Sequence, residues 1–186
     1  MKMSMKTRMN KKLLAAAAFV AVAAVAALLI LAGTRPGEER RQPLELLMGY
    51  EPPENEYPAP EFITEGLPDD LVAGEPTITP SQYPDGTPVT VMVASYTSGD
   101  NTVIVQMLDV CGEVFISNTP EIENYTFELV KLGGSTVVKY SKGEEYEGYV
   151  WYHGKYSIAV YTSPSGFPSY LTDLAELYVK RYPSTM

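Results

Sequence analysis

The chain has 186 residues, of which 20% are charged and 45% hydrophobic, and its formal net charge is −9. From Gln42 onward it holds six basic and twenty-one acidic residues, so that part alone carries a formal charge of −15. A field of this sign repels phosphate groups, which excludes nucleic acid as a partner and favours a cation or a basic protein. Solubility is the simpler interpretation of the same charge.

An apolar segment dominates the N-terminal part of the chain. Residues 13–32 contain no polar side chain, and a helix of that length rises about 30 Å, the thickness of the hydrocarbon core of a bilayer. Residues 1–12 form a short basic head. Under the positive-inside rule this head stays in the cytoplasm and the rest of the chain lies outside the cell membrane. The sequence therefore predicts a single-pass transmembrane helix that acts as a signal anchor.

A cleaved signal peptide is the alternative interpretation of the same segment. Signal peptides have a shorter apolar region, of about 7 to 15 residues, followed by a small-x-small cleavage site. Here the apolar run is longer, and bulky Ile30 lies where a small residue is preferred. The uncleaved anchor is favoured, and cleavage near Ala32 would instead give a secreted soluble protein.

A proline-rich stretch follows the apolar segment. Residues 33–88 hold eleven of the fifteen prolines of the chain. Proline at this density disfavours helices and central strands and favours extended conformations. We therefore expect a spacer over residues 33–64, in which only residues 44–50 could form a turn of helix or a docking strip. The folded domain is predicted to occupy residues 65–186.

The predicted domain consists mainly of strands. Residues alternate with period two over 89–96, 102–110, 125–132, 135–140, 146–152 and 156–161, and turn sequences separate most of these runs. Residues 113–117 are ambiguous. Short turns between neighbouring strands are typical of an antiparallel meander, here of about five to seven strands.

The last element has helical spacing instead. Leu171, Leu174, Ala175, Tyr178 and Tyr182 follow the i, i+3, i+4 pattern of an amphipathic helix. Such a helix across one face of the sheet would bury both apolar surfaces. The predicted fold class is α+β.

Residues that could carry catalysis or bind a metal are few. Cys111 is the only cysteine and His153 the only histidine, and no zinc motif, phosphate-binding loop or nucleophile elbow is present. Cys111 is expected to pack as a small hydrophobic residue, His153 to occupy a hairpin turn, and the acidic residues 144–147 to form a solvated turn. No cofactor and no metal are expected. Asn124 begins an Asn-Tyr-Thr sequon, which predicts a possible glycosylation site.

Aromatic residues concentrate on the last two predicted strands. Alternation puts Tyr149 and Trp151 on one face of the sheet and Tyr146 and Tyr152 on the other. Because one face packs under the helix, the other is expected to present tyrosines, as surfaces that bind sugars, peptides or proteins do. Cross-strand pairing is the alternative explanation. The predicted binding residues are Tyr146, Tyr149, Trp151, Tyr152, Tyr156 and Tyr161.

Several short motifs resemble those of uncharacterised archaeal and bacterial membrane-anchored proteins. They are Leu67-Pro68, Val72-Ala73-Gly74, residues 91–96 and 103–109, Val150-Trp151, Gly154-Lys155-Tyr156, Leu174-Ala175 and Tyr178. The order of sheet and helix is also similar to that of PsbP-like domains, which implies a non-catalytic accessory role. No site residue is transferred from either resemblance.

These observations favour a membrane-tethered, extracytoplasmic binding domain, a non-catalytic accessory protein of the prokaryotic cell envelope. Its expected partner is another envelope protein or a small ligand. A secreted ligand-binding protein is one alternative. A carboxylate-dependent hydrolase is another, since sequence spacing does not show which acidic residues converge.

Overall fold

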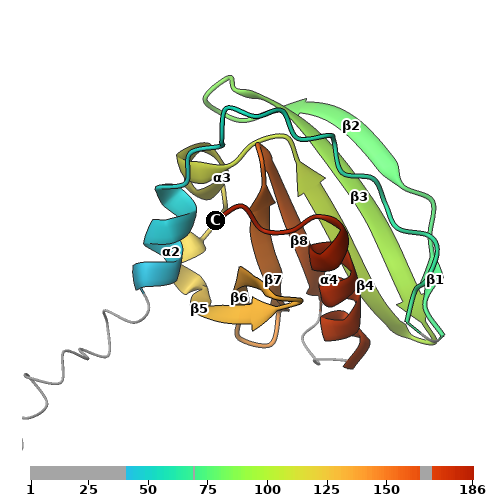
Figure 1. Cartoon of the computed structure of the whole chain (residues 1–186). Coiled ribbons are helices and arrows are strands. Elements are labelled where there is room, and N and C mark those ends of the chain that lie inside the picture. Colours follow the sequence, from blue (N-terminus) through green and yellow to red (C-terminus); the bar gives the residue numbers. More distant parts are fainter. Residues whose placement is uncertain (1–40, 69, 164–168) are drawn as a thin grey trace, which may run out of the picture. The chain divides into compact units, whose positions relative to one another are not determined.

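Alternating residues form six long antiparallel strands in the computed structural model, which describes residues 41–68, 70–163 and 169–186 (Figure 1). The prediction of strands in these six regions is confirmed. The strands are β3 (Pro88–Ser98), β4 (Asn101–Leu108), β5 (Thr126–Leu132), β6 (Ser135–Lys142), β7 (Tyr146–His153) and β8 (Tyr156–Thr162).

Two further strands bring the sheet to eight, one more than the upper end of the predicted range. They are β1 (Val72–Ala73) and β2 (Thr77–Gln82), and both pair with β3. The sequence Thr-Ile-Thr-Pro-Ser-Gln of β2 includes Pro80, which lacks a backbone N–H. Proline is tolerated in an edge strand because one side of that strand has no neighbour to bond.

The order of strands departs from a simple meander at one connection. The sheet runs β1-β3-β4-β8-β7-β6-β5, so β4 lies beside β8 and not beside β5. The chain between β4 and β5 contains α3 (Gly112–Ser117) and the 3₁₀ helix η1 (Ile122–Asn124), which together carry it to the far edge of the sheet. The ambiguous residues 113–117 are thus helical.

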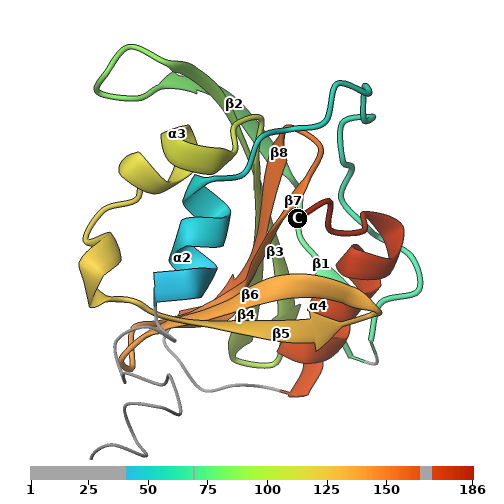
Figure 2. The ribbon, with the colours of Figure 1, turned by 60° about the vertical axis from the view of Figure 1, so that its left-hand side comes forward.

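The C-terminal helix α4 (Ser169–Arg181) covers one face of this curved sheet. In both ribbon views α4 lies on one side of β7 and β8, and α3 lies on the other side with α2 (Arg41–Met48) (Figures 1 and 2). Under α4 the fully buried residues form the main core: Tyr96, Val103, Val105, Met107, Trp151, Ile158, Val160, Leu171, Leu174 and Tyr178. The predicted α+β fold, an antiparallel sheet with a C-terminal helix, is confirmed.

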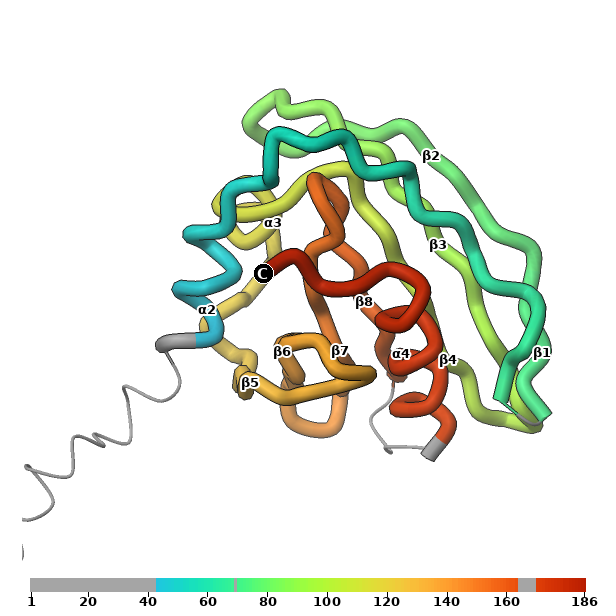
Figure 3. The backbone as a smooth tube through the Cα atoms, in the orientation of Figure 1, coloured from blue at the N-terminus to red at the C-terminus, as the bar shows by residue number. Residues whose placement is uncertain are grey.

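Most of the segment that was predicted as a spacer packs on this domain, from residue 43 onward. Leu47 of α2 is fully buried, and the extended segment after α2 runs over the sheet to β1 (Figure 3). We call residues 57–67 the strap. Backbone amides of the strap donate hydrogen bonds to side chains of the C-terminal part: the Ile63 amide donates to the Tyr178 hydroxyl at 2.9 Å, and the Glu61 amide to the Tyr182 hydroxyl at 2.8 Å. The proline-rich stretch thus contains the helix α2 and packs on the domain, although its proline density predicted an extended spacer.

The predicted transmembrane helix over 13–32 and the basic head over 1–12 lie outside the described residues, as do residues 33–40 of the predicted spacer. Within the ranges that the structure describes, no helix combines the length and apolar character needed to cross a bilayer.

Candidate functional site

Three of the six predicted aromatic binding residues belong to the core under α4. The Trp151 side chain is fully buried and its indole N–H donates to the Tyr182 carbonyl at 2.9 Å. Tyr149 is buried and its hydroxyl lies 3.0 Å from the Thr172 hydroxyl of α4. Tyr156 is buried in the same cluster. These three side chains hold the helix on the sheet and are not available to a ligand.

Tyr152 lies on the opposite face, as alternation predicted, but it is also fully buried. Its ring stacks on Tyr50 at 4.6 Å between centroids, and its hydroxyl donates to the Leu47 carbonyl of α2 at 3.1 Å. The expectation that Tyr152 is exposed is therefore wrong, because α2 comes from a part of the chain that was assigned to the spacer.

The other two residues, Tyr146 and Tyr161, line a cavity on this second face. They meet at 6.2 Å between ring centroids. Tyr125 and Tyr140, which the aromatic pattern of the last two strands does not include, line it as well. We call the space the tyrosine cavity. Its volume is about 610 Å³, within the range of small-molecule sites.

Strand register brings the tyrosines together. Phe127 pairs with Tyr140, Tyr140 with Gly148, and Gly148 with Tyr161, which makes one row across four strands. A Cβ atom at Gly148 would lie 2.5 Å from both the Val160 carbonyl and the Tyr161 Cβ, so this position accepts only glycine without a shift of β8. The glycine lets the two strands that carry the rings approach closely.

The floor of the tyrosine cavity is mostly apolar. β3, β4, β7 and β8 contribute side chains to it, while α2, α3 and the chain that leads to Tyr125 form its walls. The lining at the end away from the tyrosines includes Leu47, Val89, Val91, Leu108, Ile116 and Ala159. The arrangement gives an apolar trough with an aromatic end.

Burial raises the pKa values of three of the four phenols of this cluster. The pKa of Tyr140 is raised well above its usual value, first by desolvation and then by the neighbouring Tyr161, Tyr125 and Tyr146, and the pKa values of Tyr161 and Tyr125 are also raised by burial. Part of the Tyr140 side chain is reached by solvent through the cavity, although protein surrounds it. Within the described part of the chain, none of the four hydroxyls has a hydrogen-bond partner, so each can bond a ligand.

Charged groups line the cavity beside Tyr125, where one ammonium is paired with two carboxylates. The Lys142 ammonium contacts the Glu121 carboxylate at 2.7 Å and the Glu145 carboxylate at 2.8 Å, and it lies 5.9 Å from the centre of the Tyr125 ring. The Glu121 side chain is 60% exposed, and its hydrogen bond to Lys142 lowers its pKa. These ion pairs border the cavity without entering its floor.

One polar atom of the floor lacks a partner. Ser157 of β8 is only 2% exposed, it lines the tyrosine cavity, and its hydroxyl bonds to no group among the described residues. Its neighbours across the sheet are Leu108 and Tyr152. A buried hydroxyl without a partner is uncommon and needs a reason.

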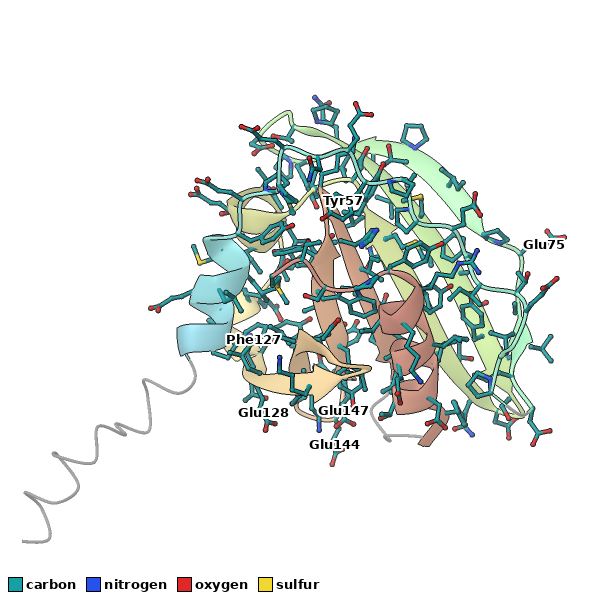
Figure 4. The ribbon with its side chains drawn as sticks, in the orientation of Figure 1. Tyr57, Glu75, Phe127, Glu128, Glu144 and Glu147 are labelled. Carbon is teal, nitrogen blue, oxygen red and sulfur yellow. The ribbon has the colours of Figure 1, made fainter. Side chains whose placement is uncertain are left out.

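The remaining candidate residues from the sequence are His153, Cys111 and Asn124. His153 is buried, its Nδ1 lies 3.0 Å from the Pro183 carbonyl, and its ring packs against Tyr57, which is labelled in Figure 4. Cys111 is half-buried, and desolvation raises the pKa of its thiol, which opposes a nucleophilic role. Asn124 is exposed at the end of η1, so the sequon prediction stays open.

The acidic turn before β7 is a surface feature. Glu144 and Glu147 lie at the same end of the molecule as Glu128 of β5 (Figure 4), and Glu147 is 3.9 Å from the Lys139 ammonium. In the ranges covered by the structure, no group of His, Cys, Asp and Glu residues could hold a metal ion. The expected solvated turn fits this geometry.

Comparison of the chain with known protein families, with curated proteins and with solved structures found no match. The resemblance to membrane-anchored prokaryotic proteins and PsbP-like domains thus stays a prediction. The site must be interpreted from its own geometry.

Proposed function

We propose that this protein is a non-catalytic binding protein of the cell envelope that takes up a small ligand in the tyrosine cavity. The observation that carries the proposal is the cavity itself: about 610 Å³ of space with an apolar floor and four convergent tyrosines. Apolar pockets of this size with a few polar groups are the usual form of a ligand site. A small ligand is therefore preferred over an envelope protein as the partner.

A binding role fits the chemistry of the cavity better than hydrolysis does. A carboxylate-dependent hydrolase needs two carboxyl groups in its pocket, one of them with a raised pKa. Glu121 is the one carboxylate among the described residues that line this cavity; it is paired with Lys142, and its pKa is lowered. The tyrosines and Ser157 can donate and accept hydrogen bonds, which is sufficient for binding.

The proposed location is the outer side of the cell membrane, with residues 13–32 as the anchor. Because α2 begins at Arg41, only residues 33–40 remain between the apolar segment and the packed chain. Eight residues span at most about 29 Å when fully extended. The tether in this proposal is consequently much shorter than a spacer over 33–64 would be.

The test uses as its probe a hydrocarbon that can enter the cavity and that carries no polar group. The full chain is placed in bilayer nanodiscs, cyclododecane is added, and thermal unfolding is followed by the emission of Trp151. Trp151 is the only tryptophan of the chain and is buried on the face opposite the cavity, so it reports unfolding without touching the probe. A ligand that binds only the folded state raises the midpoint as its concentration rises.

Two substitutions locate the binding. Ala159 lies on the cavity floor between Gln106 and Val150, so Ala159→Phe is expected to fill the space and abolish the midpoint shift. Ile78→Phe is the matched control, because Ile78 of β2 is 63% exposed and pairs with Met92, which faces the main core. No shift with the unsubstituted chain, or an equal shift in Ala159→Phe, would overturn the proposal.

A further inference from the structure

Ser157 gives the tyrosine cavity a polar point that the packing of the domain does not use. The residue belongs to β8, and two positions further along the same face the chain has Ala159, whose small side chain leaves the floor open. Tyr161 lies two positions beyond, about 13 Å from Ser157 along the strand. The floor between the unpaired hydroxyl and the tyrosine cluster therefore holds Ala159 and, beside it on β4, the polar side chain of Gln106.

No residue on the β3, β4, β7 and β8 floor of the cavity carries a charge that an ionised ligand could pair with. Lys142 and Glu121 are the ionised groups among its described lining residues, they bond each other at 2.7 Å, and Glu145 binds the same ammonium at 2.8 Å. Phenols are neutral at neutral pH, and burial raises the pKa values of Tyr140 and Tyr161 further. Burying an ion without a partner is costly, so the floor selects against ionised ligands.

We propose that the ligand of the tyrosine cavity is an uncharged, largely apolar molecule with a carbonyl or hydroxyl oxygen, and that Ser157 is the residue that selects for this oxygen. This inference rests on the proposed function, because it requires the cavity to bind a small molecule. The Ser157 hydroxyl oxygen is buried in the structure, so its side chain must turn about χ1 to reach the cavity and donate its proton to the ligand oxygen. The apolar body of the ligand extends over Ala159 towards Tyr161.

The experiment compares three probes that share one ring: cyclododecane, cyclododecanone and cyclododecanecarboxylate. Each is titrated into the full chain in nanodiscs, and its dissociation constant is taken from the midpoint of thermal unfolding reported by Trp151 emission. A net hydrogen bond of about 1 kcal/mol makes the ketone bind about fivefold more tightly than the hydrocarbon. The carboxylate is expected to bind at least about tenfold more weakly than the ketone.

Ser157→Ala isolates the hydroxyl. The substitution removes one buried atom that has no partner in the described structure, so the chain keeps its fold, and the preference for the ketone over the hydrocarbon falls from about fivefold to about onefold. Ser135→Ala is the matched control: Ser135 pairs with Leu132 at the start of β6, outside the cavity, and should leave the preference unchanged. Partition of the probes into lipid cancels when variants are compared in the same nanodiscs.

The outcomes separate this inference from the function on which it rests. If cyclododecane binds but the ketone is not preferred, Ser157 does not bond the ligand oxygen, and the inference fails while the cavity remains a binding site. If the ketone preference survives in Ser157→Ala, another group recognises the oxygen and the inference is overturned. Tighter binding of the carboxylate would refute the requirement for an uncharged ligand. If no probe binds, the proposed function and this inference both fail.

Discussion

The strap is fastened to the domain through two buried phenols, and this network makes a quantitative prediction. The Tyr96 hydroxyl donates its one proton to the Ile63 carbonyl at 2.9 Å. The Tyr178 hydroxyl, 2.5 Å from that of Tyr96, must therefore be the donor of the bond between them. It also accepts the Ile63 amide at 2.9 Å, so a single hydroxyl of α4 satisfies groups from the strap and from β3.

Tyr178→Phe removes this hydroxyl and leaves the Ile63 amide without a partner in a buried place. An unsatisfied buried donor costs about 1–3 kcal/mol, and the bond to Tyr96 adds about 1 kcal/mol. We expect the free energy of unfolding to fall by about 2–4 kcal/mol, a large part of the total of about 5–15 kcal/mol typical of a domain.

Tyr182→Phe is the matched control for this substitution. The Tyr182 hydroxyl accepts the Glu61 amide at 2.8 Å and donates to the Glu61 carbonyl at 3.1 Å, but these groups are only partly buried. Water can replace the lost hydroxyl there, so the expected loss is about 1 kcal/mol or less.

Urea unfolding of the full chain, followed by Trp151 emission, measures both variants under the same conditions. The reasoning would be refuted if Tyr178→Phe stayed within about 0.5 kcal/mol of the unsubstituted chain, or if Tyr182→Phe cost as much as Tyr178→Phe. A changed denaturant slope in Tyr178→Phe would indicate that the strap has detached in the folded state.

Three further predictions concern the rest of the domain. Burial raises the pKa values of Tyr140 and Tyr152, so their contribution to the free energy of unfolding should be constant below about pH 10 and fall above it, where the unfolded chain ionises first. Tyrosinate absorbance and Trp emission should then change in one transition. Without ligand, Ser157→Ala should raise the free energy of unfolding by about 1 kcal/mol, because it removes a buried hydroxyl without a described partner. A decrease of that size in urea unfolding would contradict this explanation. Gly148→Ala should lower the free energy of unfolding by at least about 2 kcal/mol, since the new Cβ would lie 2.5 Å from the Val160 carbonyl. An unchanged urea midpoint would show that β8 can shift freely.

Periodicity was sufficient to predict the strands and the helix but not what covers them. The alternation of β3 to β8 and the helical spacing of α4 are local patterns, and both were confirmed. Packing of α2 and the strap depends on contacts more than 100 residues apart, such as the bond from the Tyr152 hydroxyl to the Leu47 carbonyl. Proline content gave no indication of such contacts.

The candidate site could have been predicted in part. Two of its tyrosines, Tyr146 and Tyr161, were selected from the sequence, whereas Tyr125, Tyr140 and Ser157 were missed. The turns between β5 and β8 fix which residues pair, so counting outward from them gives the row Phe127, Tyr140, Gly148, Tyr161. The cavity above that row depends on where α3 and η1 lie, and no local pattern predicts this.

The position of α4 in the chain has a consequence for biosynthesis. Every strand of the sheet is translated before the helix that covers its main core, and residues 171–182 supply six of that core's buried side chains. A nascent chain that ends at β8 thus has an uncovered apolar face and cannot reach the native state. Folding of the main core is therefore postponed until the strands and the helix are together, so it completes only after the last residues have been synthesised.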